Sequence, residues 1–185
     1  MTPIDLLFPT YRQMLRMLSG LLDKAQQQMP DHAEALLSAR LADDMYPLAT
    51  QLRFAALQAQ EAAYRMRGEA IPDRLLALGA EARDVDAGPG SIADVRRRID
   101  EALAHLDTVA DDVPDPQAPV ALELPNGMAF DMTVEQYARD WALPQFYFHA
   151  VTAYAILRHH HVAIGKADYV PHMFAYLRPG TVPGA

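Results

Sequence analysis

Apolar residues recur at intervals of three and four along four long stretches of the chain, and this spacing limits the fold more than any other feature. An α-helix turns once every 3.6 residues, so the spacing places these side chains on one face of a helix. We therefore expect helices over about residues 3–29, 33–67, 91–109 and 144–158. Helices with one apolar face each are typical of an all-α bundle built around a shared core.

The second of these stretches is interrupted by Pro47, because proline removes a backbone donor and disrupts a helix interior. We expect a short helix, an irregular join and then a long helix, with Leu41, Met45 and Leu48 keeping the helical period across the join. A long connection to the third helix follows, and it contains a short helix at about Arg74–Leu78.

One part of the chain has a strand-like pattern. After a proline-rich linker at 111–119, residues 120–124 and 128–132 read as two short strands, and the Asn-Gly pair between them is typical of a hairpin turn. Thr133 and Gln136 then form a capping box that opens a short helix to about Ala142, and Pro144 suits the first turn of the last long helix.

Composition excludes several functions. The 185 residues fit a single domain, 1–185, and contain no cysteine, so disulfides, thiolate metal sites and a cysteine nucleophile are excluded. A net charge of −8 argues against nucleic acid as a partner. No apolar run reaches the roughly 20 residues of a membrane span, and the first residues do not resemble a signal peptide. We therefore expect a cytoplasmic protein that does not associate with a membrane.

His149 is the candidate functional residue with the most informative surroundings. It lies among Phe146, Phe148 and Thr152, so we expect it to be at least partly buried. A buried imidazole needs partners for its ring nitrogens. The partner is either a carboxylate in a purely structural hydrogen bond, or a metal or substrate in a ligating or catalytic role.

Asp44 has two interpretations of its own. Arg40 stands four residues earlier, and the two side chains would pair on a helix surface. Alternatively Asp44 turns inward and meets His149, because an unpaired buried carboxylate is unfavourable. Tyr147, Thr152 and Tyr154 would either line a pocket beside His149 or belong to the core.

The run His159-His160-His161 does not predict a metal site. Consecutive helical positions point about 100° apart, and eleven residues of helix separate His149 from His160 by about 16 Å. We expect these histidines at a helix C-terminus, where positive charge is favourable. Trp141 and the aromatic residues of the tail either pack inward or belong to a dimer surface.

Three segments together resemble a known family. Residues 40–48, 143–159 and 162–169, with the hairpin and the order of the helices, are similar to an uncharacterised bacterial family with a domain of unknown function. That family is grouped with the DinB-like, or YfiT-like, proposed metalloenzymes. The resemblance implies an antiparallel four-helix bundle with a long crossover, often assembled as a homodimer.

The same resemblance implies a divalent metal, zinc or nickel, held by one histidine of the second helix and a His-x-x-x-His pair of the last. Here His149 matches the first member of the pair, Ala153 stands at the second, and Asp43 and Asp44 occupy the matching segment of the second helix. Asp44 and His149 are then the candidate ligands of an incomplete site. The implied function is a metal-dependent enzyme acting on a small molecule. The alternative is a non-catalytic dimeric bundle that binds a small ligand or a protein partner.

Overall fold

The computed structural model describes residues 2–84, 88–109 and 115–181. Most of these residues are helical, and two strands form a small antiparallel sheet. In chain order the elements are α1 (Pro3–Gln28), η1 (Glu34–Ser38), α2 (Leu48–Met66), α3 (Asp73–Arg83), α4 (Ile92–Thr108), β1 (Pro119–Glu123), β2 (Ala129–Thr133), α5 (Val134–Gln136), η2 (Tyr137–Ala142), α6 (Leu143–His159), α7 (Lys166–Tyr169) and η3 (Pro171–Tyr176).

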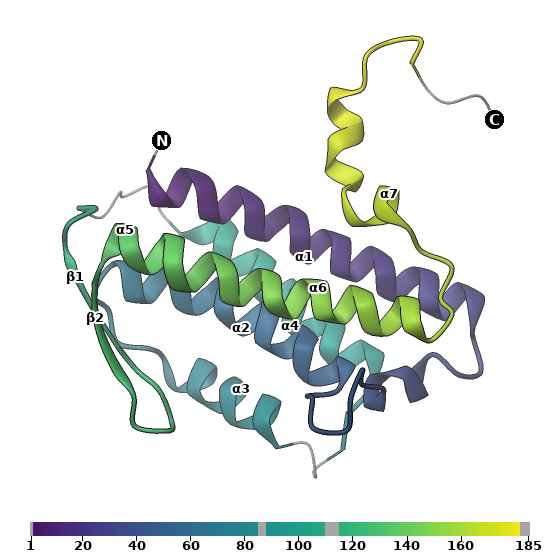
Figure 1. Ribbon diagram of the computed structural model, residues 1–185, viewed down its shortest axis with the longest axis horizontal. Helices are drawn as coiled ribbons and strands as arrows, with labels where there is room; N and C mark the ends of the chain where they lie inside the picture. Colours follow the sequence, from purple (N-terminus) through teal and green to yellow (C-terminus); the bar gives the residue numbers. More distant parts are fainter. Residues whose placement is uncertain (1, 85–87, 110–114, 182–185) are drawn as a thin grey trace.

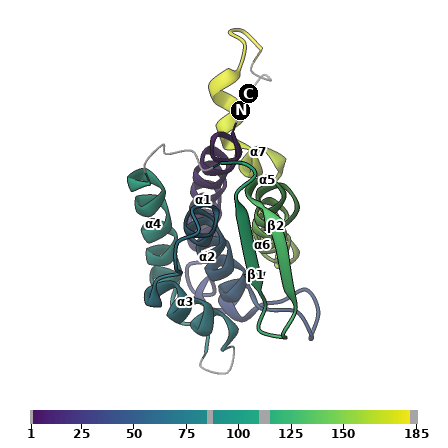
Figure 2. The same cartoon turned by 90° about the vertical axis from the view of Figure 1, so that its left-hand side faces the viewer.

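The long helices α1, α2, α4 and α6 form a four-helix bundle, as expected. Helices α1 and α6 run in one direction, and α2 and α4 run in the opposite direction (Figure 1). Viewed end-on, α4 and α6 lie on opposite sides of α1 and α2 (Figure 2), and each of them packs against both. Because α2 and α4 are parallel, the chain between them must travel back along the bundle, and α3 makes that crossover.

The core is formed by the apolar stripes that the sequence predicts. Leu15 and Leu18 of α1, Leu52 of α2, Ile99 of α4 and Phe146 of α6 are fully buried in one cluster. Alanine fills much of the buried face of α2, where its small side chain lets neighbouring helices approach closely. A second, smaller cluster between α2 and α3 contains Phe54, Leu57, Leu75, Leu78 and Ala82.

The short helix, irregular join and long helix expected around Pro47 all form, but the join does not keep the helical period that we expected. Residues 39–47 form a loop rather than a helix that continues the apolar period, and α2 begins only after Pro47. The residue before a proline is disfavoured in the helical region, and here the loop is closed by a hydrogen bond from Leu48 N to Ala39 O (2.8 Å). The crossover helix α3 is also longer than expected, because Leu78 and Ala82 extend its buried face onto α2.

The hairpin forms where expected, but Pro125 and Asn126 rather than Asn126 and Gly127 are the central residues of its turn, because Gly127 N donates to Leu124 O (2.9 Å). Leu122 pairs with Phe130, and Gly127 has φ +87°, a left-handed conformation that glycine adopts without strain. Val120 and Leu122 are the buried side chains of β1, which packs against α2. The predicted linker lies partly outside the described residues, since 110–114 are not described.

The helix that we expected to end near Ala142 instead continues into α6 as one run (Figure 1). Its middle, η2, is π-helical, and Leu143 N bonds to Ala138 O five residues earlier. Pro144 explains this geometry, because proline has no N–H and its ring clashes with the carbonyl four residues before it. Widening the turn removes the clash without ending the helix.

The last described residues stand away from the bundle (Figure 1). Helix α7 contacts α1, where Lys24 pairs with Asp168 at 2.5 Å, but η3 buries none of its residues. In the described part of the chain, no helix is long and apolar enough to cross a membrane.

Candidate functional site

His149 is buried at the interface of α6 and α2, and its polar partner is Gln51 rather than a carboxylate. Its side chain is 8% exposed, and Nδ1 lies 2.8 Å from Gln51 Oε1. Gln51 Nε2 donates to Tyr46 O (3.0 Å), which fixes the orientation of the amide so that its oxygen faces the imidazole. His149 is therefore the Nδ1–H tautomer, and Nε2 keeps a lone pair.

Aromatic rings enclose the imidazole on two sides. The ring of Phe54 stacks on it at 4.9 Å between centroids, and Phe148 meets it edge-on at 5.3 Å. Burial among these groups lowers the pKa of His149 to about 4, because a charged imidazolium would lose its hydration. The side chain is uncharged at neutral pH.

Asp44 does not occupy the inward position that one interpretation gave it. It is exposed in the loop before α2, and that loop is not helical, so the expected helical face does not exist. Arg40 donates to the backbone oxygen of Asp43 (3.3 Å) rather than to the Asp44 carboxylate. The α2 side chain that reaches His149 is Gln51, the third residue after Leu48 on the buried face of α2.

The three proposed pocket residues make contacts of different kinds. Thr152 is buried, and its hydroxyl donates to Phe148 O at 2.6 Å. Tyr147 is half-buried against Phe146, and burial raises the pKa of Tyr147. The ring centroids of Tyr154 and of Tyr169 in α7 are 5.6 Å apart, and this contact joins α6 to the start of the tail.

The histidine run ends α6, as expected. His159 is the last residue of the helix, and His161 has a positive φ of 67°, which turns the chain away. In the described residues, no group of three or more His, Asp or Glu side chains is placed to hold a metal ion. The residues present do not fit the three-histidine site that the resemblance implies. Ala153 has no donor atom, Asp43 and Asp44 are exposed in the loop before α2, and the α2 side chain beside His149 is the neutral amide of Gln51.

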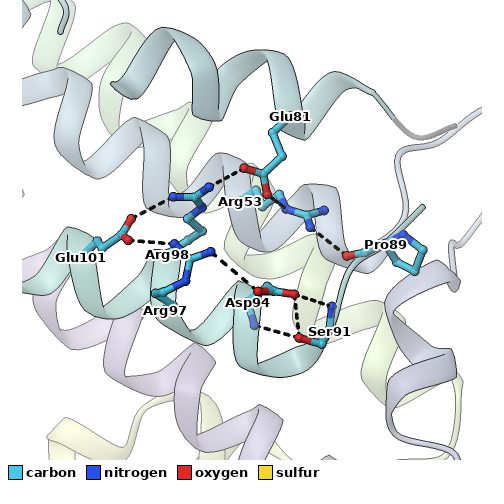
Figure 3. Close-up of polar contacts among 8 residues, drawn as sticks. All are labelled: Arg53, Glu81, Pro89, Ser91, Asp94, Arg97, Arg98 and Glu101. Atoms are coloured by element: carbon cyan, nitrogen blue, oxygen red, sulfur yellow. Dashed lines mark hydrogen bonds and ion pairs between the residues drawn. The ribbon is translucent and has the colours of Figure 1, made fainter. Parts of the chain in front are cut away.

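A second polar cluster, on α2, α3 and α4, consists of charges that pair with one another (Figure 3). Arg53 is 5% exposed, and its Nε lies 2.9 Å from Glu81 Oε1, while its Nη2 donates to Pro89 O at 2.8 Å. The other oxygen of Glu81 contacts Arg98 at 2.6 Å. Glu101 pairs with Arg98 in turn (3.2 Å). One carboxylate thus joins α2 and α4 through the crossover helix.

A third polar cluster, Glu61, Arg65 and Arg83, lies farther along α2 beside a cavity. Neither this cluster nor the Arg53 cluster follows from a motif. Their sequence signal is weak but real, because Gln51, Arg53 and Glu61 are polar residues within a helix whose other positions are mostly apolar. Buried polar residues need hydrogen-bond or ion-pair partners, and the sequence does not identify those partners.

Comparisons with known proteins agree with the helical-bundle fold. A family model described as a domain of unknown function (DUF1993) matches residues 4–170. A crystal structure described as a DinB family member protein from Shewanella denitrificans is similar over 97% of this chain and 95% of that chain, with 28% identity and a TM-score of 0.73. No curated protein matches the chain. The chain therefore belongs to the DUF1993 family, a domain of unknown function within the DinB-like superfamily.

Proposed function

We propose that this protein is a non-catalytic, homodimeric DinB-like bundle whose outer α6 face binds a second copy. The observation that carries the proposal is the composition of α6, which is apolar on all sides. Its inner face is buried in the core, yet Phe148 is 56% exposed and Val151 is 45% exposed on the outer face. A helix that is apolar all round is normally covered on both sides.

The tail adds further exposed apolar side chains. Tyr154 of α6 contacts Tyr169 of α7, and beyond it Met173, Phe174 and Tyr176 are more than half exposed. A groove of about 500 Å³ between α1 and the tail is open beside Phe174. A stable dimer buries roughly 1,200–2,000 Å² in total, and a helix face continued by an aromatic arm offers a surface of that kind.

The polar pair at His149 supports a structural role. Gln51 is a neutral amide, and its oxygen is already used by the imidazole. A single hydrogen bond between two buried side chains holds α2 and α6 in one register, because any other register would leave both groups unpaired.

The alternative is a metal-dependent enzyme acting on a small molecule, with zinc or nickel as its ion. One observation favours it: His149 is uncharged and presents a free Nε2 lone pair, which is the form of histidine that binds metal. Asp44, as an exposed carboxylate, would have to move inward to take part. We place the protein in the cytoplasm, and its charge of −8 gives nucleic acid no attraction to it.

The dimer is tested by Val151→Glu, measured by sedimentation equilibrium at micromolar concentration. We expect wild type at twice the monomer mass and the variant at the monomer mass, because a carboxylate would have to be desolvated in the interface. Leu41→Glu is the matched control, since Leu41 is similarly exposed (41%) but lies in the loop before α2. A monomeric wild type, or an unaffected variant, would refute the proposed interface.

Metal content of the same preparations separates the two functions. Protein purified without a tag or nickel resin is analysed by plasma mass spectrometry beside His149→Ala. We expect far less than one ion per chain in both samples. Near-stoichiometric zinc or nickel in wild type that is lost from His149→Ala would support the enzyme and overturn the non-catalytic proposal.

A further inference from the structure

The cavity beside the third polar cluster lies between α2, α3 and the end of β1. Its volume is about 340 Å³, within the range of small-ligand sites. The hairpin lies beside α3 in this part of the molecule (Figure 1). The apolar lining is formed by Leu57, Leu75, Leu76, Leu124 and Pro125. The polar lining is formed by Glu61, Arg65, Arg83 and Glu123.

Glu61 and Arg65 lie close together, but their charged atoms are not within hydrogen-bonding distance of each other. Their closest oxygen and nitrogen are 3.7 Å apart, longer than a hydrogen bond, although only 15% and 20% of the side chains are exposed. Burial raises the pKa of Glu61, and the positive charges of Arg65 and Arg83 oppose that rise. The two guanidinium groups therefore do not fully compensate the burial of the carboxylate.

Arg65 and a neighbouring tyrosine also have buried polar atoms without a hydrogen-bond partner. Arg65 Nε is buried and has no hydrogen-bond partner within the described part of the chain. The Tyr137 hydroxyl likewise has none there. Burial raises its pKa, and the charges of Arg65 and Glu61 act on it in opposite directions. The Arg83 guanidinium carbon lies 5.8 Å from the centre of the Phe54 ring, so the group is positioned by an aromatic contact.

The balance of charge around the cavity decides what it would accept. Two guanidinium groups face two carboxylates, so a simple anion would be opposed by Glu61 and Glu123, and a simple cation by Arg65 and Arg83. A molecule with both charges meets no such opposition. The leucine side chains and Pro125 favour an apolar body in the same molecule.

We propose that this cavity binds a small zwitterion with an apolar side chain, of the size of a branched-chain α-amino acid. Arg65 and Arg83 bind its carboxylate, Glu61 binds its ammonium group, and the leucines cover its side chain. The site goes beyond the proposed function, and it depends neither on the dimer nor on a metal at His149.

Isothermal titration calorimetry with three matched probes tests the proposal. The probes are L-leucine, 4-methylpentanoate, which lacks the amine, and 3-methylbutylamine, which lacks the carboxylate. We expect L-leucine to bind, and each single-charge analogue to bind at least about tenfold more weakly, because each loses a charge-assisted hydrogen bond. Binding of 4-methylpentanoate as tight as that of L-leucine, or no binding of any probe, would overturn the proposal.

Three variants locate the site. Glu61→Gln preserves side-chain size, and Arg83→Gln replaces the guanidinium with a shorter uncharged amide. Each is expected to weaken L-leucine binding about tenfold or more. Arg97→Gln is the control, since Arg97 is exposed on α4 and pairs with Glu101 (3.0 Å). Arg83 is exposed, so its variant is expected to fold even if Glu61→Gln does not. Equal affinity in Arg83→Gln and Arg97→Gln would overturn the proposal.

Discussion

Two charged clusters lie where α3 packs against α2, and they use the same residue types in different ways. In the cluster of Arg53, Glu81 and Arg98, the ion pairs of Glu81 measure 2.9 Å and 2.6 Å. In the cluster of Glu61, Arg65 and Arg83, the one ion pair measures 3.7 Å. The first cluster has little room around it, whereas the second borders a cavity of about 340 Å³.

The difference shows that buried charge serves two purposes here. A carboxylate that is shared by two guanidinium groups has no further need of a partner, so it contributes to the position of the crossover helix. A carboxylate and a guanidinium whose closest atoms are 3.7 Å apart beside a cavity can each still pair with a ligand. The same residue types thus support a structural role in one cluster and a binding role in the other.

The largest expected effect is on stability. Glu81→Gln leaves Arg53 buried without its counter-charge, and we expect the free energy of unfolding to fall by about 3 kcal/mol. Glu61→Gln removes a carboxylate that burial already disfavours, so we expect a loss of less than about 1 kcal/mol. Urea unfolding of both variants measures the two losses. Equal losses would mean that the two clusters do not differ in the way we describe.

The hydrogen bond between Gln51 of α2 and His149 of α6 is a buried polar contact without charge, and the pH dependence of stability tests it. Because the pKa of His149 is lowered from 6.5 to about 4, the unfolded chain binds the proton first as the pH falls. Stability is therefore full above pH 6.5 and declines between pH 6.5 and 4, by about 2 to 3 kcal/mol in total.

Denaturant unfolding at several pH values between 4.5 and 7 measures that decline. His149→Gln should flatten it, because the variant has no imidazole to titrate at this position. The exposed His159→Gln should keep the slope of wild type. A wild-type slope in His149→Gln would mean that another group controls acid stability.

The smallest expected effect concerns the crowding around Arg53. Gly90 has φ +72°, and a Cβ added there would lie 2.9 Å from Arg53 Nη2. Gly88 has φ +87°, with nothing within 4 Å of an added Cβ. We expect Gly88→Ala to lose about 1 kcal/mol from backbone strain, and Gly90→Ala to lose up to about 2 kcal/mol because Arg53 must also move. Equal thermal stability of the two variants would indicate that the Arg53 cluster has room to adjust.

Local patterns predicted those parts of the fold that local interactions decide. The first helix ends within one residue of the expectation, at Gln28, and the Thr133–Gln136 capping box forms. The hairpin also forms at the expected place, with Pro125 and Asn126 at the centre of its turn. Each of these features depends on residues a few positions apart, so spacing in the sequence is sufficient to find them.

The expectations were only partly correct where two local signals competed. The short helix, irregular join and long helix expected around Pro47 form, but the apolar period of the join does not form a helical face, and the loop exposes Asp44. Pro144 lies in the first turn of α6 as expected, but the preceding helix does not end, because a π-helical turn joins it to α6. Packing decides which signal prevails at such a position.

The sequence by itself determined the long helices, their apolar faces and the hairpin, because these follow from residue type and short-range spacing. Only the tertiary structure decided which polar side chains of α2 meet which partners. Gln51 and His149 are 98 positions apart in the chain, and Arg53 meets Glu81 from a different helix. A buried polar group must find a partner, but its choice depends on how helices pack, and no local pattern contains that information.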